Sequence, residues 1–191
     1  MRDKNLLREE FRARRRAMTR DDAAHLSARI AERLLAMPEV RAARTILSTI
    51  AFGREADTRA ALAVLAAEGR RVLVPCADPC ADAATALCEI GPGHPLLTGA
   101  APKPAMALAA MESPLLPEVD LFLVPGIVWD LRGYRVGFGG GYFDRLLAPA
   151  RADALKVGVA YDWQVIDRLA PDAWDVPVDR IVTELRIVDC R

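Results

Sequence analysis

The stretch VDLFLVPGIVWDLRGYRVGFGGGYFDRLL, residues 119–147, contains a strand, a glycine-rich loop and a helix in direct succession. Residues 119–126 are so continuously apolar that they predict a strand buried on both faces of a sheet. Four of the five residues from 137 to 141 are glycine, and residues 142–150 then predict a short helix. This order predicts an α/β fold whose ligand binds near the loop, beyond the carboxyl end of the strand.

The rest of the chain also alternates between helices and strands. Apolar spacing predicts helices at 3–18, from a cap at Thr19 to Pro38, and at 59–69 with Gly69 as its terminating glycine. Strands are predicted at 44–52, 70–77, 84–90 (a short one), 155–161 and 179–190 (a strand or terminal hairpin), and a helical turn or two at 163–169. The remainder of 78–118 shows no clear pattern. Strand–helix–strand order predicts parallel pairing with right-handed crossovers. We therefore expect one domain, residues 1–191, with a three-layer α/β/α architecture and a mostly parallel twisted sheet.

The overall charge argues against a polyanionic partner. Lys+Arg and Asp+Glu are equal at 26 each, so the whole molecule has no field to attract nucleic acid or a membrane surface. Residues 1–20 are an exception, because they hold eight basic and three acidic side chains. This excess indicates either a solvated helix face or a basic helix that meets an anion.

No apolar stretch approaches the length of a membrane span, and the charged N-terminus lacks the apolar core of a signal peptide. We expect a cytoplasmic monomer that binds neither nucleic acid nor membrane.

The four cysteines, at 76, 80, 88 and 190, have no CxxC spacing, and the sequence contains only two histidines that could join them as metal ligands. This pattern predicts free thiols and makes a zinc site improbable.

The glycine loop has a chemical interpretation. Glycines between a strand and a helix can present backbone N–H groups to an anion, and a phosphate suits that arrangement. Asp144 follows at once, which makes sense if Mg²⁺ accompanies the phosphate. The loop is neither a dinucleotide-binding fingerprint, whose third glycine is replaced by Tyr142, nor a Walker A motif, which needs a lysine. The alternative is a tight turn in which the glycines merely permit close packing.

The same region resembles the signature of the 5-formyltetrahydrofolate cyclo-ligase family. The matching residues are Pro125, Gly126, Trp129, Asp130, Gly133, Arg135, Gly137, Gly139, Gly140, Gly141, Tyr142, Asp144 and Arg145. The resemblance extends to Lys4 and Arg8 near the start, to Glu55, Asp57 and Thr58, to Gln164, and to DVPVDRIVT at 175–183. Phe143 stands where the family often has a second Tyr, and Trp174 where it commonly has His.

The resemblance implies an enzyme that uses ATP and Mg²⁺ to close 5-formyltetrahydrofolate to 5,10-methenyltetrahydrofolate, releasing ADP and phosphate. It implies catalytic roles for Arg135 and Tyr142, and Mg²⁺ ligands at Asp144 and Asp179. The ATP-binding residues that it implies are Lys4, Arg8, Arg135, Gly137, Phe138, Gly139, Gly140, Gly141, Tyr142 and Phe143. The substrate-binding residues that it implies are Ile50, Glu55, Gly139, Gly140, Gly141 and Tyr142.

Each polar residue also has a structural alternative. Lys4 and Arg8 could be surface charges, and Glu55 and Asp57 could cap the helix that starts near Thr58. Asp144 could serve the first turn of its own helix, and Asp179 could open the last strand. At the level of function, the alternatives are a non-catalytic folate- or nucleotide-binding paralogue and a related ATP-dependent enzyme that acts on a different substrate.

Overall fold

The computed structural model describes residues 3–75, 87–100 and 113–190. Within these residues, the main sheet has seven strands. In order across the sheet they are β10 (Ile187–Asp189), β9 (Arg180–Val182), β7 (Leu155–Val159), β4 (Leu121–Pro125), β1 (Thr45–Ser48), β2 (Arg71–Pro75) and β3 (Leu87–Glu89). The strands from β9 to β2 pair in parallel, and β10 and β3 add antiparallel edges. The mostly parallel sheet and the terminal hairpin of the prediction are confirmed.

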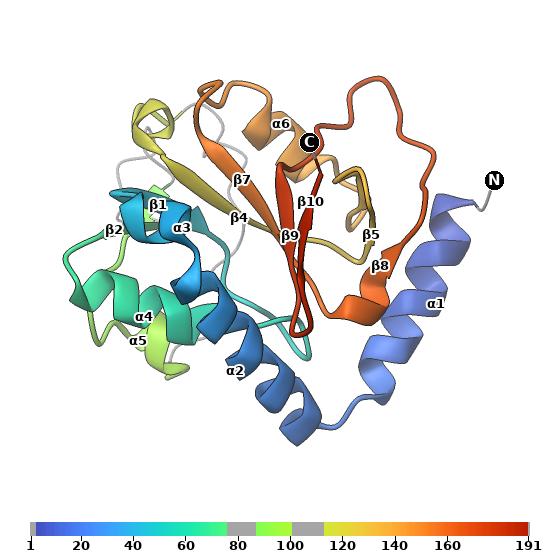
Figure 1. Ribbon diagram of the computed structural model, residues 1–191, viewed down its shortest axis with the longest axis horizontal. Helices are drawn as coiled ribbons and strands as arrows, with labels where there is room; N and C mark the ends of the chain where they lie inside the picture. Colours follow the sequence, from blue (N-terminus) through green and yellow to red (C-terminus); the bar gives the residue numbers. More distant parts are fainter. Residues whose placement is uncertain (1–2, 76–86, 101–112, 191) are drawn as a thin grey trace.

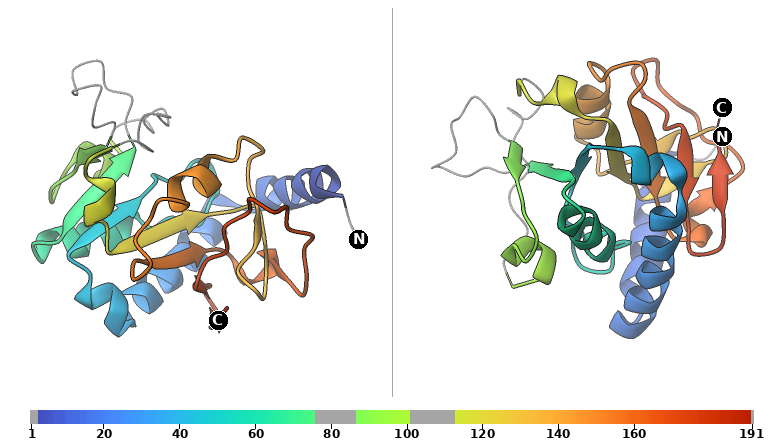
Figure 2. Two further views of the ribbon diagram at one scale, coloured as in Figure 1. Left: turned by 90° about the horizontal axis from the view of Figure 1, so that it is seen from above. Right: turned by 60° about the vertical axis from the view of Figure 1, so that its left-hand side comes forward.

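Helices cover both faces of this sheet (Figures 1 and 2). They are α2 (Arg20–Ala36), α3 (Pro38–Ala42), α4 (Arg59–Ala67) and α5 (Pro95–Thr98) on one side, and α6 (Tyr142–Leu147) with the 3₁₀ helix η2 (Leu116–Glu118) on the other. Strand β1 shows why two helical layers are needed: Ile46 packs with the first group of helices, and Leu47 packs with α6. Because neighbouring side chains on a strand point to opposite faces, an apolar run buries both. The three-layer architecture is confirmed.

The helix boundaries follow their capping residues. The Thr19 hydroxyl accepts a hydrogen bond from the backbone N of Asp22, which opens α2 as predicted. Gly69, with φ at +83°, follows the end of α4. Pro38 does not simply end α2, because it also begins α3. Proline suits the first turn of a helix, where its missing N–H would have had no intrahelical partner.

A second, three-stranded sheet lies beside the main one and was not predicted. Its strands are β6 (Arg135–Val136), β5 (Val128–Asp130) and β8 (Val165–Ile166). Helix α1 (Lys4–Ala17) packs on this sheet through Leu7 and Phe11. The predicted helical turn at 163–169 is only partly correct: a 3₁₀ helix, η3 (Asp162–Gln164), is followed directly by β8. Gln164 is buried, and its amide donates to the carbonyl oxygens of Gly126 and Ile127.

Trp129 fixes how the two sheets meet. Its ring is fully buried, and a Cβ added to Gly126 or Gly158 would lie 2.6 or 2.7 Å from it. Asp130, also fully buried, accepts hydrogen bonds from the backbone N of Arg132, Tyr134 and Leu169. The Trp129 ring and the Asp130 carboxylate thus hold the small sheet in place. The last residue of its strand β6, Val136, directly precedes the glycine loop.

None of the helices in the described ranges is long and apolar enough to cross a membrane.

The prediction about the cysteines needs a correction. Cys190 is a free thiol, but Cys88 is disulfide-bonded. Composition and spacing do not show which cysteines pair, because bonding depends on which thiols the fold brings together. Cys76 and Cys80 lie outside the described residues.

Candidate active site

The glycine loop, residues 137–141, connects β6 of the small sheet to α6, which packs on the main sheet. Gly139 has φ at +107° and Gly141 at +59°, a region that favours glycine. A Cβ added at Gly137 or Gly140 would meet nothing within 4 Å in the described structure. Close packing therefore does not explain why these two positions lack side chains. Open space above the backbone is what a bound anion would require.

The basic face of α1 lies against this loop. Arg8 Nε donates a hydrogen bond to the Gly137 carbonyl oxygen at 2.9 Å. The guanidinium groups of Arg12 and Arg15 lie 5.4 and 5.9 Å from the ring centroid of Phe138. Part of the positive charge of the N-terminal segment is thus concentrated at the glycine loop rather than spread over a solvated helix face.

Lys4 has different partners from Arg8. Its ammonium group lies 2.6 Å from a carboxylate oxygen of Asp172 and 2.7 Å from one of Asp175. Partial burial lowers the pKa of Lys4, but the two carboxylates outweigh this effect, and the net shift is upward. Lys4 therefore ties the 172–175 segment to the start of α1, and the two cations that the resemblance implies as ATP-binding residues, Lys4 and Arg8, meet different groups in this structure.

Arg135 and Asp144 form a buried ion pair under the loop. The Arg135 side chain is only 4% exposed; its guanidinium donates to Oδ1 of Asp144 and to the Val176 carbonyl oxygen, both at 2.7 Å. The backbone N of Val176 donates to the same Asp144 oxygen at 3.2 Å. Burial lowers the pKa of Arg135, and the charges of Asp144 and Asp175 partly offset that shift. An arginine starts from so high a pKa that it remains a cation here.

Two cavities meet at the glycine loop. The first, about 230 Å³, is lined by Phe52, Glu55, Pro125, Arg135, Gly137, Phe138, Gly140, Gly141, Tyr142, Phe143 and Asp144. The second, about 430 Å³, is lined by Gly139, Gly140, Gly141, Asp144, Arg145, Ala148 and Trp174. They share Gly140, Gly141 and Asp144. A group bound at these three residues would be accessible from both sides.

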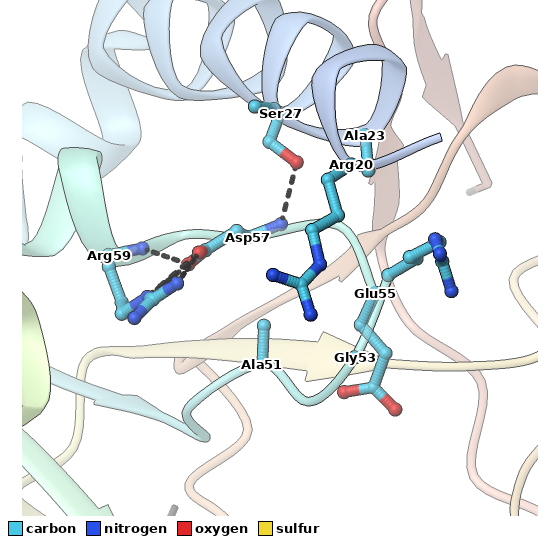
Figure 3. A pocket seen from close by; sticks show the side chains of 10 residues that line it. Arg20, Ala23, Ser27, Ala51, Gly53, Glu55, Asp57 and Arg59 are labelled. Carbon is cyan, nitrogen blue, oxygen red and sulfur yellow. Dashed lines mark hydrogen bonds and ion pairs between the residues drawn. The ribbon is translucent and has the colours of Figure 1, made fainter. Parts of the chain in front are cut away.

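Glu55, like Asp144, lines the first cavity. Its side chain is 9% exposed, with Oε2 accepting from the Phe52 backbone N at 2.9 Å and Oε1 lying 3.3 Å from Arg15. It also borders a cavity of about 330 Å³, shown in Figure 3. There the Asp57 carboxylate faces Arg59, and the Glu55 carboxylate points away from that pair. Asp57 accepts from the Arg59 backbone N, so the helix-capping alternative is correct for Asp57, whereas Glu55 bonds to its own loop.

Three further predicted residues have distinct environments. Burial raises the pKa of Tyr142 to about 12, so its hydroxyl stays protonated at neutral pH beside the first cavity. Ile50 is 4% exposed and belongs to the main core, and it lines none of the cavities described above. Asp179 lines neither cavity that Asp144 lines; its Oδ2 accepts from the Lys156 backbone N at 2.8 Å, where β7 and β9 begin.

The structure does not bring Asp144 and Asp179 together in a recognisable metal centre. No group of three or more His, Cys, Asp or Glu side chains within residues 3–75, 87–100 and 113–190 could hold a metal ion. A cation at this site would have to take further ligands from water or from a bound phosphate.

Sequence reasoning assigned no site role to several residues that line or support the site. Phe52 is 67% exposed at the mouth of the first cavity, and Trp174 is 71% exposed in the second. Arg15 contacts Glu55, and Asp175 links Lys4 to the surroundings of Arg135. Phe52 alone had a signal of its own in the sequence: it is a large aromatic residue close to the carboxyl end of a predicted strand and next to a polar turn.

Comparisons with known proteins identify the family of this chain. The family model of the 5-formyltetrahydrofolate cyclo-ligase family matches residues 1–184. The 5-formyltetrahydrofolate cyclo-ligase of Escherichia coli (strain K12) is 28% identical over 178 residues, spanning 93% of this chain and 98% of that protein. The 5,10-methenyltetrahydrofolate synthetase structure of Aquifex aeolicus superposes with a TM-score of 0.75 at 30% identity, covering 98% of this chain and 93% of that one. That of Mycoplasma pneumoniae gives 0.69 at 25% identity, covering 96% and 99%. This chain belongs to the 5-formyltetrahydrofolate cyclo-ligase family.

Proposed function

We propose that this protein converts 5-formyltetrahydrofolate to 5,10-methenyltetrahydrofolate in a reaction that consumes ATP and releases ADP and phosphate. The observation that carries the proposal is the pair of cavities that share Gly140, Gly141 and Asp144, with the buried cation Arg135 beside them. An enzyme that transfers a phosphoryl group between two substrates needs both to reach one anion-binding point. The names of the family and of its solved relatives supply the substrate and product.

The chemistry proceeds in three steps. The formyl oxygen attacks the terminal phosphorus of ATP, and ADP leaves. The N10 amine then attacks the formyl carbon, which phosphorylation has made electrophilic. Finally, the C–O bond breaks, phosphate leaves with the former formyl oxygen, and loss of the N10 proton accompanies formation of the methenyl bridge. Positioning and charge neutralisation supply most of the catalysis in such a reaction.

The glycine loop and Arg135 stabilise the transferring phosphoryl group. The backbone N–H groups of residues 137–142 bind its oxygens, and Arg135 compensates their negative charge from below the loop. Because Asp144 and Val176 already fix its guanidinium, Arg135 needs little reorganisation as the reaction proceeds. Tyr142 contributes a neutral hydroxyl that can donate a hydrogen bond to substrate or phosphate.

The first cavity accepts the folate. Glu55 accepts hydrogen bonds from the N–H donors of the pterin, and Phe52 and Phe138 provide apolar contacts for its rings. The ATP phosphates approach the loop under the positive charge of Arg8, with Gly137, Phe138, Gly139 and Phe143 contributing backbone contacts. Lys4 acts on the nucleotide through the 172–175 segment that it holds. Ile50 supports the substrate loop from the core.

The donor set at Asp144 fits Mg²⁺, which proteins typically hold through one or two carboxylates together with substrate phosphates and water. Both hydrogen bonds to Asp144 within the described residues use Oδ1. When bound, the ion would neutralise phosphate charge. Asp179 stays a prediction for the second carboxylate, because its Oδ2 accepts from the backbone of Lys156.

A coupled omission assay tests the proposal. Purified protein is mixed with Mg²⁺, ATP and 5-formyltetrahydrofolate, and the methenyl chromophore is followed in the near ultraviolet. We expect the signal only when all components are present, and loss of it when EDTA removes the metal. Absence of the chromophore at high enzyme concentration would exclude this activity. If ATP still bound under those conditions, a non-catalytic nucleotide-binding paralogue would be the better account.

A further inference from the structure

We propose that the indole ring of Trp174 is the platform on which the purine base of ATP stacks, so that the larger cavity holds the nucleotide. The inference rests on the proposed function for the identity of the nucleotide. The two cavities then divide the substrates, with the folate on the Glu55 side of the glycine loop and ATP on the Trp174 side. Their three shared residues mark where the phosphoryl group passes from one to the other.

Trp174 differs from the other two tryptophans in its environment. It is 71% exposed, more than any other large apolar side chain among the described residues. Trp129 is fully buried, and the Trp163 ring packs between Phe11 and Tyr161 with centroid distances of 5.9 and 6.0 Å. Trp174 is thus a large aromatic surface that the fold itself does not use.

The backbone around Trp174 is held firmly. Lys4 bridges Asp172 and Asp175 on either side of it, and the Asp172 backbone N donates to the Asp175 carboxylate at 2.9 Å. One residue further, Val176 is bonded to both Arg135 and Asp144. In Figure 1 this segment runs beside the first turn of α1 on its way from β8 to β9. The exposed indole is therefore carried by an anchored segment, which suits a stacking surface.

The residues that line the cavity beside Trp174 include a group suited to each half of a nucleotide. Its phosphate end is formed by Gly139–Gly141 and Asp144. Arg145 lines it too, with its guanidinium donating to the Gly140 carbonyl oxygen at 2.8 Å. The base end is the indole. Stacking of a nucleobase on an aromatic side chain is favourable and largely independent of base identity, because every base has a π face.

The charge distribution decides which ring system lies on which side. A pterin presents N–H donors along one edge, and Glu55, which provides a carboxylate for them, lines the first cavity. The second cavity has no such carboxylate within its described lining apart from Asp144, which belongs to the phosphate end. The base of ATP is therefore the flat ring that matches Trp174.

Comparing ATP with inorganic tripolyphosphate isolates the contribution of the base. Dissociation constants of both are measured by calorimetry, with Mg²⁺ and without folate, for the wild type, Trp174→Ala, Trp174→Phe and Leu185→Ala. Leu185 is a matched control because it is an exposed apolar side chain, 56% exposed, on the turn between β9 and β10. Trp174→Ala should weaken ATP binding by about 5- to 150-fold, the range for loss of an aromatic stacking partner. Tripolyphosphate binding should not change. The dissociation constant of ATP should be close to the wild-type value for Trp174→Phe and equal to it for Leu185→Ala.

Several outcomes would overturn the inference. Equal weakening of ATP and tripolyphosphate would assign Trp174 to the phosphate end or to the fold, and no weakening would remove it from the site. Loss of 5-formyltetrahydrofolate binding instead would place the pterin on the indole. No ATP binding by the wild type would refute both the inference and the proposed function. Because the measurement needs no turnover, a base-dependent loss in Trp174→Ala would support the inference even if no methenyl product formed.

Discussion

Replacing Asp144 by Asn would keep the shape of the side chain and remove its charge. In the structure, Oδ1 of Asp144 accepts from the Arg135 guanidinium at 2.7 Å and from the Val176 backbone N at 3.2 Å. The Arg135 side chain is 4% exposed, so the substitution leaves a buried cation facing an amide and the Val176 carbonyl oxygen. Both the free energy of unfolding and the rate of turnover should fall, and by different amounts.

Removing one partner of a buried ion pair typically costs about 3–5 kcal/mol. The Asp144 side chain is 20% exposed and the Asn oxygen can still accept a hydrogen bond, so a smaller loss is expected. We expect about 2 kcal/mol, which in a domain of this size lowers the Tm by about 4–8 °C. Turnover should fall further, by about 100- to 1,000-fold, as when preorganised charge stabilisation is lost at a reacting centre.

Asp120→Asn is the matched control. Its carboxylate accepts from the backbone N of Arg44 and Thr45 and pairs with Arg151 at 3.0 Å, at the amino ends of β1 and β4. Thermal unfolding by circular dichroism and the rate of methenyl formation are measured for both variants at a temperature where both are folded. Asp120→Asn should lose stability and keep its turnover. Wild-type turnover in Asp144→Asn, or equal activity losses in the two variants, would refute the reasoning.

Lys4→Ala should raise the KM for ATP more than the KM for 5-formyltetrahydrofolate, because Lys4 anchors the 172–175 segment on the nucleotide side. Steady-state kinetics that showed the larger increase for 5-formyltetrahydrofolate would place this segment on the folate side. For Tyr142, burial raises the pKa to about 12, so the unfolding free energy should fall as the pH rises from the ordinary value near 10 towards 12. Tyr142→Phe should flatten that slope in urea titrations, and an unchanged slope would show that Tyr142 is not its source. Gly158→Ala adds a Cβ 2.7 Å from the Trp129 ring and should cost about 1–3 kcal/mol in denaturant unfolding. Trp129→Phe should recover part of that loss in the double variant, whereas simple additivity of the two losses would contradict the contact.

The central strands could be predicted because a continuous run of apolar residues indicates a strand that is buried on both faces. Residues 121–125 are apolar without a break, and the structure buries both faces of that strand. The hairpin of the second sheet was missed because its strands are short. Its signal was the segment Asp130–Gly133, since Asp at the first and Gly at the fourth position favour a β-turn. A fully buried carboxylate that holds three backbone N–H groups has no distinctive pattern in a single sequence.

The same distinction between local and long-range information applies to the residues of the site. The glycine loop is contiguous, so the prediction that it binds an anion rests on residues 137–141 alone. The contacts of Lys4 with Asp172 and Asp175 join residues 168 and 171 positions apart, and local spacing contains no information about such pairs. The exposure of Trp174 and the division of the site into two cavities depend on how distant segments meet. These features emerge only from the folded chain.

The central claim is that the formyl oxygen receives the phosphoryl group of ATP between the two cavities. Substrate labelled with ¹⁸O at the formyl group tests it most directly, with the released phosphate analysed by mass spectrometry. The account predicts one ¹⁸O atom in the phosphate for each methenyl product formed. Unlabelled phosphate accompanying methenyl formation would contradict it, because the oxygen would then have left the folate by another route.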